Sequence, residues 1–346
     1  MHKISIKNTF LSLRKMTPFN VLALLICILS IISVYGLVFG AGLHPFSSSK
    51  KYISSSDNME GSKDLKVSGT KYFVSSDYNE EQNYGSKYKE IKHKTFSHLI
   101  IEFNQADYQW SLQPKTENNV PRIFVNFLPE DLADIFPIQK RKSLFIAAVL
   151  PLVLLANEEI LKERNRLEDL VKGKWKFEEL NENSKKWLVN LAMRYEVEKG
   201  NFQQLLERID IIPPSLAIAQ AAEESGWGTS RFAREGNSLF GLYTYDQESG
   251  MKPLDRTKGQ KYYIQAYNSL IDTVRSYMHN LNYHFAYQEF REKRSLQRKN
   301  KGGLDSIQLL EYLTRYSLRG EQYITAIREI ILSNDLKKLD QSHLSL

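Results

Sequence analysis

Two adjacent carboxylates, Glu223 and Glu224, stand directly before a Ser-Gly-Trp-Gly sequence that ends at Gly228. Near the C-terminal end of a helix, a carboxylate meets the negative end of the helix dipole, and burial further disfavours its charged form. Both effects raise the pKa toward the range that suits proton donation near neutral pH. Adjacent helical residues point about 100° apart, so at most one glutamate faces a given pocket. The pattern therefore indicates one general acid, although two solvated glutamates after a core helix fit it at least as well.

A short buried helix is needed to hold these carboxylates, and the preceding residues predict one. Residues 216–222 are almost all small or apolar, and a helix that is apolar on most sides is usually buried. Pro213 and Pro214 suit a first helical turn, where no backbone donor is missed. Gly226 and Gly228 are typical of a helix end. The carboxylates would therefore lie in the last turn of this helix.

Three segments stand out around the carboxylates. They are Ala-Gln-Ala-Ala-Glu-Glu-Ser-Gly-Trp-Gly at 219–228, Asn-Ser-Leu-Phe-Gly at 237–241, and the pair Tyr316 and Tyr323. Together they resemble the glucosaminidase domain of peptidoglycan hydrolases, glycoside hydrolase family seventy-three. The Bax-like subgroup of membrane-associated bacterial proteins is the closer match, and the resemblance covers roughly residues 119–333.

The resemblance implies an α+β fold that is mostly helical, with a lysozyme-like glucosaminidase domain and a small β lobe. It also implies that the glutamate directly before Ser-Gly-Trp-Gly, Glu224, is the catalytic acid, whereas Glu223 falls on an ordinary helix position. Eight further motif residues would bind substrate or shape the cleft: Trp227, Asn237, Phe240, Gly241, Tyr263, Tyr267, Tyr316 and Tyr323.

Structural roles compete for several of these residues. Asn237 and Gly241 suit a turn almost as well as a cleft. Phe240 suits a core better than a sugar platform, and Tyr at helical spacing is commonly core. Tyr316 is the preferred substrate contact among the tyrosines near the acid.

Hydrolysis of a glycosidic bond usually needs a second carboxylate, as nucleophile or as base for water. In the family this acid often lies in the β lobe, and our alignment places Tyr263 where a glutamate is common. Asp246, Glu248 or Asp255 would supply it instead, with Asp246 and Glu248 slightly preferred, although each also fits a solvated loop acid. Tyrosines that order water, or the N-acetyl group of the substrate acting as nucleophile, are the other two routes.

Composition excludes little else. The chain has 346 residues and a formal net charge of +7, which fits partners with carboxylates or phosphates but points to none. A single cysteine, Cys27, excludes an internal disulfide and a cysteine-based metal site. His279 and His284 miss the spacing of helical metal ligands, so we expect neither a metal nor a cofactor.

The run from Phe19 to Leu43 carries no charge, and about 20 apolar residues span a bilayer. Basic residues in 1–18 place the N-terminus in the cytoplasm. We therefore predict a single-pass signal-anchor at 19–43 in the bacterial inner membrane, with the C-terminal domain in the periplasm or outside the membrane. A cleaved signal peptide is the alternative, but its apolar core is typically only about 7–15 residues. Residues 44–94 are predicted to be a flexible linker.

The rest of the chain is predicted as three regions. Residues 95–180 form an N-terminal helical and extended region, 181–335 the glucosaminidase domain, and 336–346 a C-terminal tail. In the first region, 98–103 and 122–127 are predicted strands. The apolar stretch 142–157 contains Pro151 and is predicted to be a buried helix rather than a second span.

Two local features complete the prediction. Asn183 is the expected cap of a helix over 181–199. The basic cluster at 291–301 lacks interleaved aromatic residues, so it does not indicate nucleic-acid binding. We interpret this cluster as a solvated linker between helices.

Together, these patterns predict a cell-envelope endo-β-N-acetylglucosaminidase, similar to mannosyl-glycoprotein endo-β-N-acetylglucosaminidases, that cuts peptidoglycan glycan strands. One alternative is a catalytically weak or inactive peptidoglycan-binding or scaffolding protein anchored in the inner membrane. Another is an interaction protein whose residues 95–210 recruit partners. The expected partners are glycan strands and the inner membrane, without nucleic acid, and the sequence indicates no protein partner.

Overall fold

The structure is a computed structural model. It describes residues 89–91, 95–108, 119–173, 176–254, 256, 259–300 and 303–345. All of them belong to one compact unit, residues 65–346. The predicted anchor at 19–43, the basic segment before it, almost all of the predicted linker and Asp255 lie outside the described residues.

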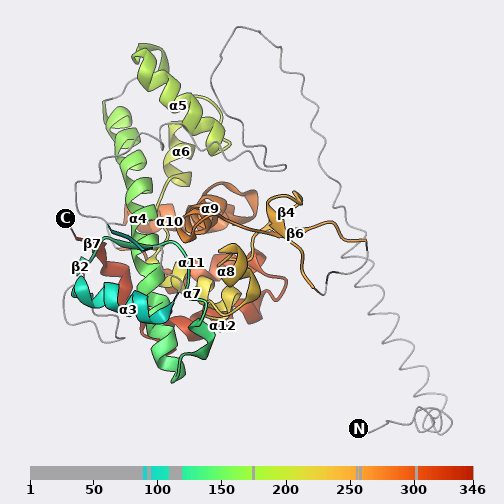
Figure 1. Cartoon of the computed structure of the whole chain (residues 1–346). Coiled ribbons are helices and arrows are strands. Elements are labelled where there is room, and N and C mark those ends of the chain that lie inside the picture. The colour runs from blue at the N-terminus through green and yellow to red at the C-terminus, as the bar shows by residue number, and fades with distance from the viewer. Residues whose placement is uncertain are drawn as a thin grey trace, which may run out of the picture. The chain divides into compact units, whose positions relative to one another are not determined.

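The central element is α4, a helix of 35 residues from Ile138 to Lys172. It is long and apolar enough to cross a membrane, but 83% of its most apolar stretch is buried within the protein. The prediction of a buried helix over 142–157 is therefore confirmed, and Pro151 lies inside the helix without ending it. Two helices pack along α4, namely α7 (Pro214–Ser225) and α9 (Leu270–Tyr283) (Figure 1).

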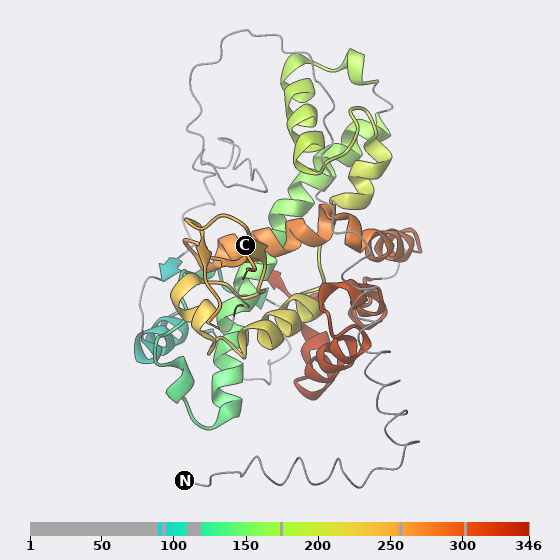
Figure 2. The ribbon, with the colours of Figure 1, turned by 90° about the vertical axis from the view of Figure 1, so that its right-hand side faces the viewer.

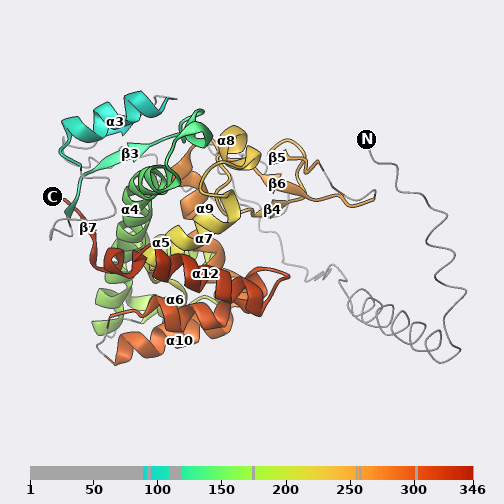
Figure 3. The same cartoon turned by 90° about the horizontal axis from the view of Figure 1, so that it is seen from below.

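Helix α7 begins and ends as predicted. Pro214 occupies its first turn, and Gly226 ends it in the left-handed conformation at φ 57°, which a residue without a Cβ adopts easily. Besides α4, it packs against α12 (Glu321–Ser333) and the 3-10 helix η6 (Leu336–Gln341), as the view from below shows (Figure 3). The helix that carries the carboxylates is thus enclosed by segments from both halves of the described chain.

The residues expected to form a C-terminal tail pack into this core. Asp340 accepts hydrogen bonds from the backbone amide and the hydroxyl of Ser215, both at 2.8 Å, and so caps the first turn of α7. The strand β7 (His343–Leu344) pairs in parallel with β2 (Asn119–Val120). The C-terminal end of the described chain is therefore joined to residues 119–120.

The N-terminal region differs from the prediction at one element. Residues 98–103, predicted as a strand, belong to the helix α3 (Phe96–Gln105). Leu99 and Phe103 are four residues apart and both buried, which is the spacing of one helix face. The second predicted strand is present as β3 (Ile123–Val125). It pairs in parallel with β1 (Lys89–Ile91), whose residues belong to the predicted linker.

Helices α5 (Glu182–Arg194) and α6 (Phe202–Arg208) lie beside the C-terminal half of α4 (Figure 2). The cap of α5 is Asn181 rather than Asn183, because the Asn181 side chain accepts from the amide of Ser184 at 2.9 Å. The helix also ends five residues before the predicted Lys199, because the chain turns at Glu196, which has a φ of 51°.

A small antiparallel sheet interrupts the helices after α8 (Arg231–Gly236). Its strands are β4 (Tyr243–Thr244), β5 (Gly250–Met251) and β6 (Tyr263–Gln265), in the order β4-β6-β5. The remaining elements are short or amphipathic helices: η2 (Leu132–Asp134), η3 (Phe177–Glu179), η4 (Phe285–Tyr287), α10 (Gln288–Lys299), α11 (Ser306–Leu310) and η5 (Glu311–Tyr316). The prediction of a mostly helical fold with a small sheet is confirmed.

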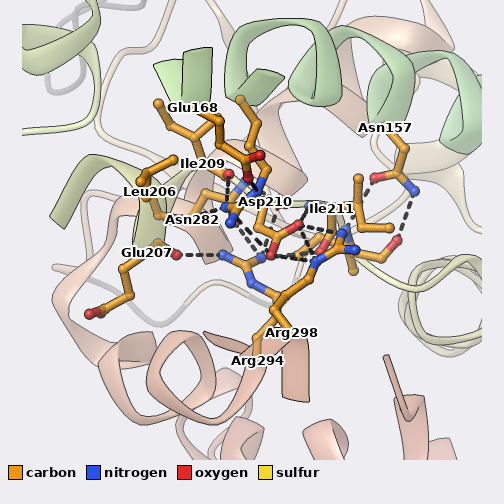
Figure 4. Close-up of polar contacts among 12 residues, drawn as sticks. Asn157, Glu168, Leu206, Glu207, Ile209, Asp210, Ile211, Asn282, Arg294 and Arg298 are labelled. Carbon is orange, nitrogen blue, oxygen red and sulfur yellow. Dashed lines mark hydrogen bonds and ion pairs between the residues drawn. The ribbon is translucent and has the colours of Figure 1, made fainter. Parts of the chain in front are cut away.

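The basic cluster at 291–301 is not a solvated linker. Most of it forms α10, where the side chains of Arg291 and Arg294 are almost completely buried. Arg294 donates to four backbone carbonyls between residues 207 and 211 and to Asn282 Oδ1 (Figure 4). Arg294 thus binds the loop that leads into α7, and Arg291 donates to the carbonyls of Leu281 and His284 instead of facing water.

Asp210 lies at the centre of the same loop and is itself buried. Arg298 donates to both of its carboxylate oxygens, at 3.0 Å and 2.7 Å (Figure 4). Arg164 of α4 forms an ion pair with the same carboxylate, at 3.7 Å. From α4, Asn157 exchanges two hydrogen bonds with the backbone of Ile212. The loop is thereby held between α4 and α10, which fixes where α7 begins.

Candidate active site

Glu224 lies in the last turn of α7, with its side chain partly buried. Burial raises the pKa of its carboxyl group above the ordinary value, and the neighbouring Glu223 adds to this shift. A hydrogen bond with Tyr323 and the positive charge of Arg319 act in the opposite direction, without cancelling it. A carboxyl group with a raised pKa is the form that serves as a general acid.

Four tyrosines from separate segments lie close enough to Glu224 for its charge to act on their hydroxyl groups: Tyr243 of β4, Tyr287 of η4, Tyr316 of η5 and Tyr323 of α12. Burial is the main cause that raises the pKa of each phenol, to about 12 for Tyr287, and the charge of Glu224 adds to the shift in all four. The acid therefore has several neutral phenols in its neighbourhood. Its surroundings offer hydrogen bonds and aromatic faces.

A chain of buried hydrogen bonds sets the role of Tyr323. The Tyr277 hydroxyl donates to Gln220 Oε1 at 2.7 Å, and Gln220 Nε2 donates to the Tyr323 hydroxyl at 2.9 Å. The Tyr323 oxygen accepts a hydrogen bond from Gln220, so the Tyr323 hydrogen is free to be donated to another group. That group is the Glu224 carboxylate, because an ionised carboxylate accepts hydrogen bonds and has none to donate. Gln220 lies one helical turn before Glu224 on the same helix.

The motif at 237–241 lies against the acid. At Gly241, where φ is 62°, an added Cβ would stand 3.5 Å from Glu224 Oε2. The Tyr316 hydroxyl donates to the carbonyl of Phe240 at 3.1 Å, and the Phe240 ring stacks on Tyr277 at 3.9 Å between centroids. Phe240 is fully buried, so it contributes as support for this turn.

Asn237 shapes the start of the same turn. It ends α8 with a φ of 51°, and its side chain donates to the carbonyl of Tyr267 at 3.0 Å. The Tyr267 hydroxyl is hydrogen-bonded to Ser276 at 2.9 Å. Both residues therefore tie the motif to the segment that enters α9.

Glu223 is engaged elsewhere. Its carboxylate pairs with Arg319 at 2.7 Å, and the guanidinium group of Arg319 also lies 5.2 Å from the centre of the Tyr323 ring. Of the two adjacent glutamates, Glu224 is the one that faces the tyrosines.

Trp227 packs at the edge of the core after α7. Its ring meets Phe145 edge-to-face at 5.8 Å, and Lys142 Nζ lies 4.6 Å from the ring centre. The half-buried ring leaves part of its surface open.

The candidates for a second acid lie in the turn between β4 and β5. Asp246 accepts from the amide of Glu248 at 3.0 Å and from the hydroxyl of Ser249 at 2.9 Å, so both of its oxygens stabilise this turn. Glu248 is exposed. Tyr263 pairs with Thr244 across the sheet, and Arg256 lies over its ring at 4.7 Å. The charges that act on Glu224 among the described residues are those of Glu223 and Arg319.

Several residues of this site were not singled out from the sequence. Gln220 stands four residues before Glu224, and that spacing alone could have placed both on one helix face. Tyr243, Tyr287 and Arg319 carry no comparable local signal, because only packing between distant segments brings them to the acid.

The chain is similar in sequence to known proteins over part of its length. Residues 199–336 match the glucosaminidase family, described as mannosyl-glycoprotein endo-beta-N-acetylglucosaminidase. The chain is 36% identical over 190 residues to Protein bax of Escherichia coli K12, a match that covers 53% of this chain and 66% of that protein. The chain thus spans just under two thirds of the length of this relative.

Among solved structures, the catalytic domain of the autolysin Auto from Listeria monocytogenes matches 51% of this chain and 96% of its own. The identity is 17% and the TM-score is 0.29. The family match supports a glycoside hydrolase. Residues 199–336 are a glucosaminidase-family domain, within a chain that is Bax-like in sequence.

Proposed function

We propose that this protein is a cell-envelope endo-β-N-acetylglucosaminidase that hydrolyses peptidoglycan glycan strands, with Glu224 as the general acid. The observation that carries this proposal is the environment of Glu224. The carboxyl group ends a buried helix, has a raised pKa, and stands among four tyrosines inside a glucosaminidase-family domain.

In the proposed reaction, the protonated Glu224 gives its proton to the oxygen of the leaving sugar as the glycosidic bond breaks. Tyr323 then stabilises the carboxylate by donating a hydrogen bond to it. The nearby phenols of Tyr316 and Tyr287 stay neutral at working pH, because their pKa values are raised. Because the Tyr316 hydroxyl donates to the carbonyl of Phe240, its oxygen is suited to accepting a hydrogen bond from a polar group of the sugar.

The second catalytic group is proposed to come from Asp246 or Glu248. The alternative route uses the acetamido oxygen of the substrate as the nucleophile, which requires no second protein carboxylate. Loss of activity in Asp246→Asn or Glu248→Gln as large as that in Glu224→Gln would identify that acid. Near-normal rates in both variants would favour the acetamido route.

The experiment that tests the proposal uses the full chain and purified peptidoglycan. The released fragments are reduced with borohydride and analysed by mass spectrometry, which shows whether N-acetylglucosamine or N-acetylmuramic acid stands at the new reducing end. We expect N-acetylglucosaminitol from the wild type and a loss of roughly 10²–10⁴-fold in Glu224→Gln.

Glu223→Gln is the matched control, because it changes the adjacent carboxylate that pairs with Arg319. It should retain most of the activity. Equal release by wild type and Glu224→Gln would show that Glu224 is misassigned, and absence of release by the wild type would contradict the enzyme proposal.

A second candidate function is a peptidoglycan-binding or scaffolding protein with weak chemistry. It is favoured by Tyr263 at the position where the family commonly has a glutamate, and by the turn-stabilising hydrogen bonds of Asp246. Binding of the full chain to peptidoglycan sacculi without any new reducing ends would support it.

A further inference from the structure

Two tyrosines of the small sheet β4-β6-β5 form a pair that is partly open to solvent. Tyr243 of β4 leaves 69% of its surface exposed, and Tyr262 is half-buried. The ring of Tyr262 meets it edge-to-face, with centroids 4.9 Å apart and planes at 68°. Tyr243 lies opposite Ile264, so Tyr262 is its diagonal neighbour on the same sheet face.

This pair is continuous with the acid. Tyr243 follows Gly241 by two residues, and an added Cβ at Gly241 would stand 3.5 Å from Glu224 Oε2. The pKa of Tyr243 is raised, first by partial burial of its hydroxyl group, then by Tyr262, and then by the charge of Glu224. Tyr243 therefore lies near the acid, close enough for the charge of Glu224 to act on its phenol.

The chemistry of the pair suits a sugar ring. A pyranose presents a face of C–H groups to an aromatic ring and hydroxyl groups to polar neighbours. Tyrosine offers a large face with few rotatable bonds and a phenol at its edge. The edge-to-face contact with Tyr262 holds the Tyr243 ring in place before any ligand arrives, which lowers the entropic cost of binding.

We propose that Tyr243 and Tyr262 form a sugar-binding subsite for the N-acetylhexosamine residue next to the cleaved bond, with the Tyr243 ring as its platform. This inference rests on the proposed function for the identity of its ligand. The proposed ligand of these two tyrosines is the glycan strand of peptidoglycan, not the peptides attached to the strand.

The test measures binding without turnover. The full chain carrying Glu224→Gln is titrated with N-acetylglucosamine oligosaccharides by calorimetry, alone and combined with Tyr243→Ala or Tyr262→Ala. We expect Tyr243→Ala to raise Kd by about threefold to tenfold, with a smaller rise for Tyr262→Ala, as for loss of one aromatic contact. Tyr243→Phe should stay near the parent, because it keeps the ring.

Tyr245→Ala is the matched control, because Tyr245 is 74% exposed in the same lobe but has no part in the proposed pair. An unchanged Kd in Tyr243→Ala, an equal loss in Tyr245→Ala, or binding of free stem peptide at the same site would overturn the subsite. Thermal unfolding of each variant shows that the fold is intact.

The outcomes separate the two proposals. If the wild type releases reducing ends from peptidoglycan while Tyr243→Ala binds oligosaccharide like its parent, the subsite fails and the glycosidase proposal stands. If Tyr243→Ala loses affinity but the wild type releases nothing, the subsite stands and the glycosidase proposal fails.

Discussion

Asp210 and Glu224 are both carboxylates withdrawn from water, at opposite ends of the segment that contains α7, and their surroundings are opposite. Burial raises the pKa of Asp210, but the hydrogen bonds of Arg298 and the charges of Arg294, Arg298 and Arg164 outweigh it, so the net pKa is lowered. Around Glu224 the neighbours are mainly phenols, and burial prevails.

The contrast shows how one residue type serves two purposes. A buried carboxylate ringed by guanidinium groups stays ionised and holds the loop before α7. A carboxyl group among neutral phenols can keep its proton and give it up during a reaction. The neighbouring side chains, rather than burial alone, decide which role each carboxylate takes.

The largest effect on stability is expected at Asp210. Asp210→Asn removes the charge that compensates Arg298 and Arg294, and breaking a buried ion pair by removing one partner costs about 3–5 kcal/mol. The free energy of unfolding, measured by urea denaturation at neutral pH, should fall by this amount. A loss below about 1 kcal/mol would show that the arginines hold the loop through its carbonyls alone.

Glu224→Gln should raise the free energy of unfolding, whereas Asp210→Asn should lower it. Folding disfavours the ionised form of this carboxyl group, so a neutral amide in its place should stabilise the protein at neutral pH. We expect a gain of about 0.5–2 kcal/mol, the size common for a single stabilising substitution. Thermal unfolding of this variant beside Glu223→Gln checks it. A destabilised Glu224→Gln protein would contradict the comparison.

The two effects should also diverge with pH. Asp210 has a folded pKa below its ordinary 3.8, so its contribution to stability is present above that value and is lost as the pH falls through the folded pKa. Glu224 has a folded pKa above its ordinary 4.5, so its contribution is present below that value and is lost as the pH rises through the folded pKa.

The difference in unfolding free energy between Asp210→Asn and wild type should therefore shrink in acid, and the gain from Glu224→Gln should vanish there. Denaturation curves for the three proteins at pH 7 and at a pH well below 3.8 measure both trends. Parallel behaviour of the two variants would contradict the assigned environments.

The smallest expected effect comes from the chain of hydrogen bonds to Glu224. Tyr323→Phe removes the donor that lowers the pKa of Glu224, so the high-pH limb of kcat/KM should move to higher pH. The rate should fall by about 2–10-fold, the worth of one hydrogen bond.

Gln220→Leu should also move the high-pH limb of kcat/KM to higher pH. It removes the hydrogen bond from Gln220 that orients the Tyr323 hydroxyl toward Glu224. Tyr316→Phe is the control, because the Tyr316 hydroxyl donates to the carbonyl of Phe240. A limb that stays in place in Tyr323→Phe and Gln220→Leu would show that the chain is structural only.

The helix that carries the candidate acid could be predicted because its signals are local, since Pro214 and Gly226 mark the ends of α7 through backbone geometry. The choice of Glu224 over Glu223 came from the resemblance to the glucosaminidase family, and its catalytic role stays a prediction. The buried nature of residues 142–157 was also predictable, because an apolar run of that length has few other places to lie. Residues 98–103 could have been assigned correctly, since Leu99 and Phe103 have helical spacing.

The chain's own residues thus determined the helix α7 and the turn that follows it. Tertiary structure decided which further groups lie near Glu224, because Tyr243, Tyr287 and Arg319 come from segments that only packing brings together. It also decided that Arg294 is a core residue rather than a solvated one. The sequence of a charged helix face is the same whether its side chains form hydrogen bonds with water or with backbone carbonyls. Only the neighbouring segments in the folded protein show which partner is present.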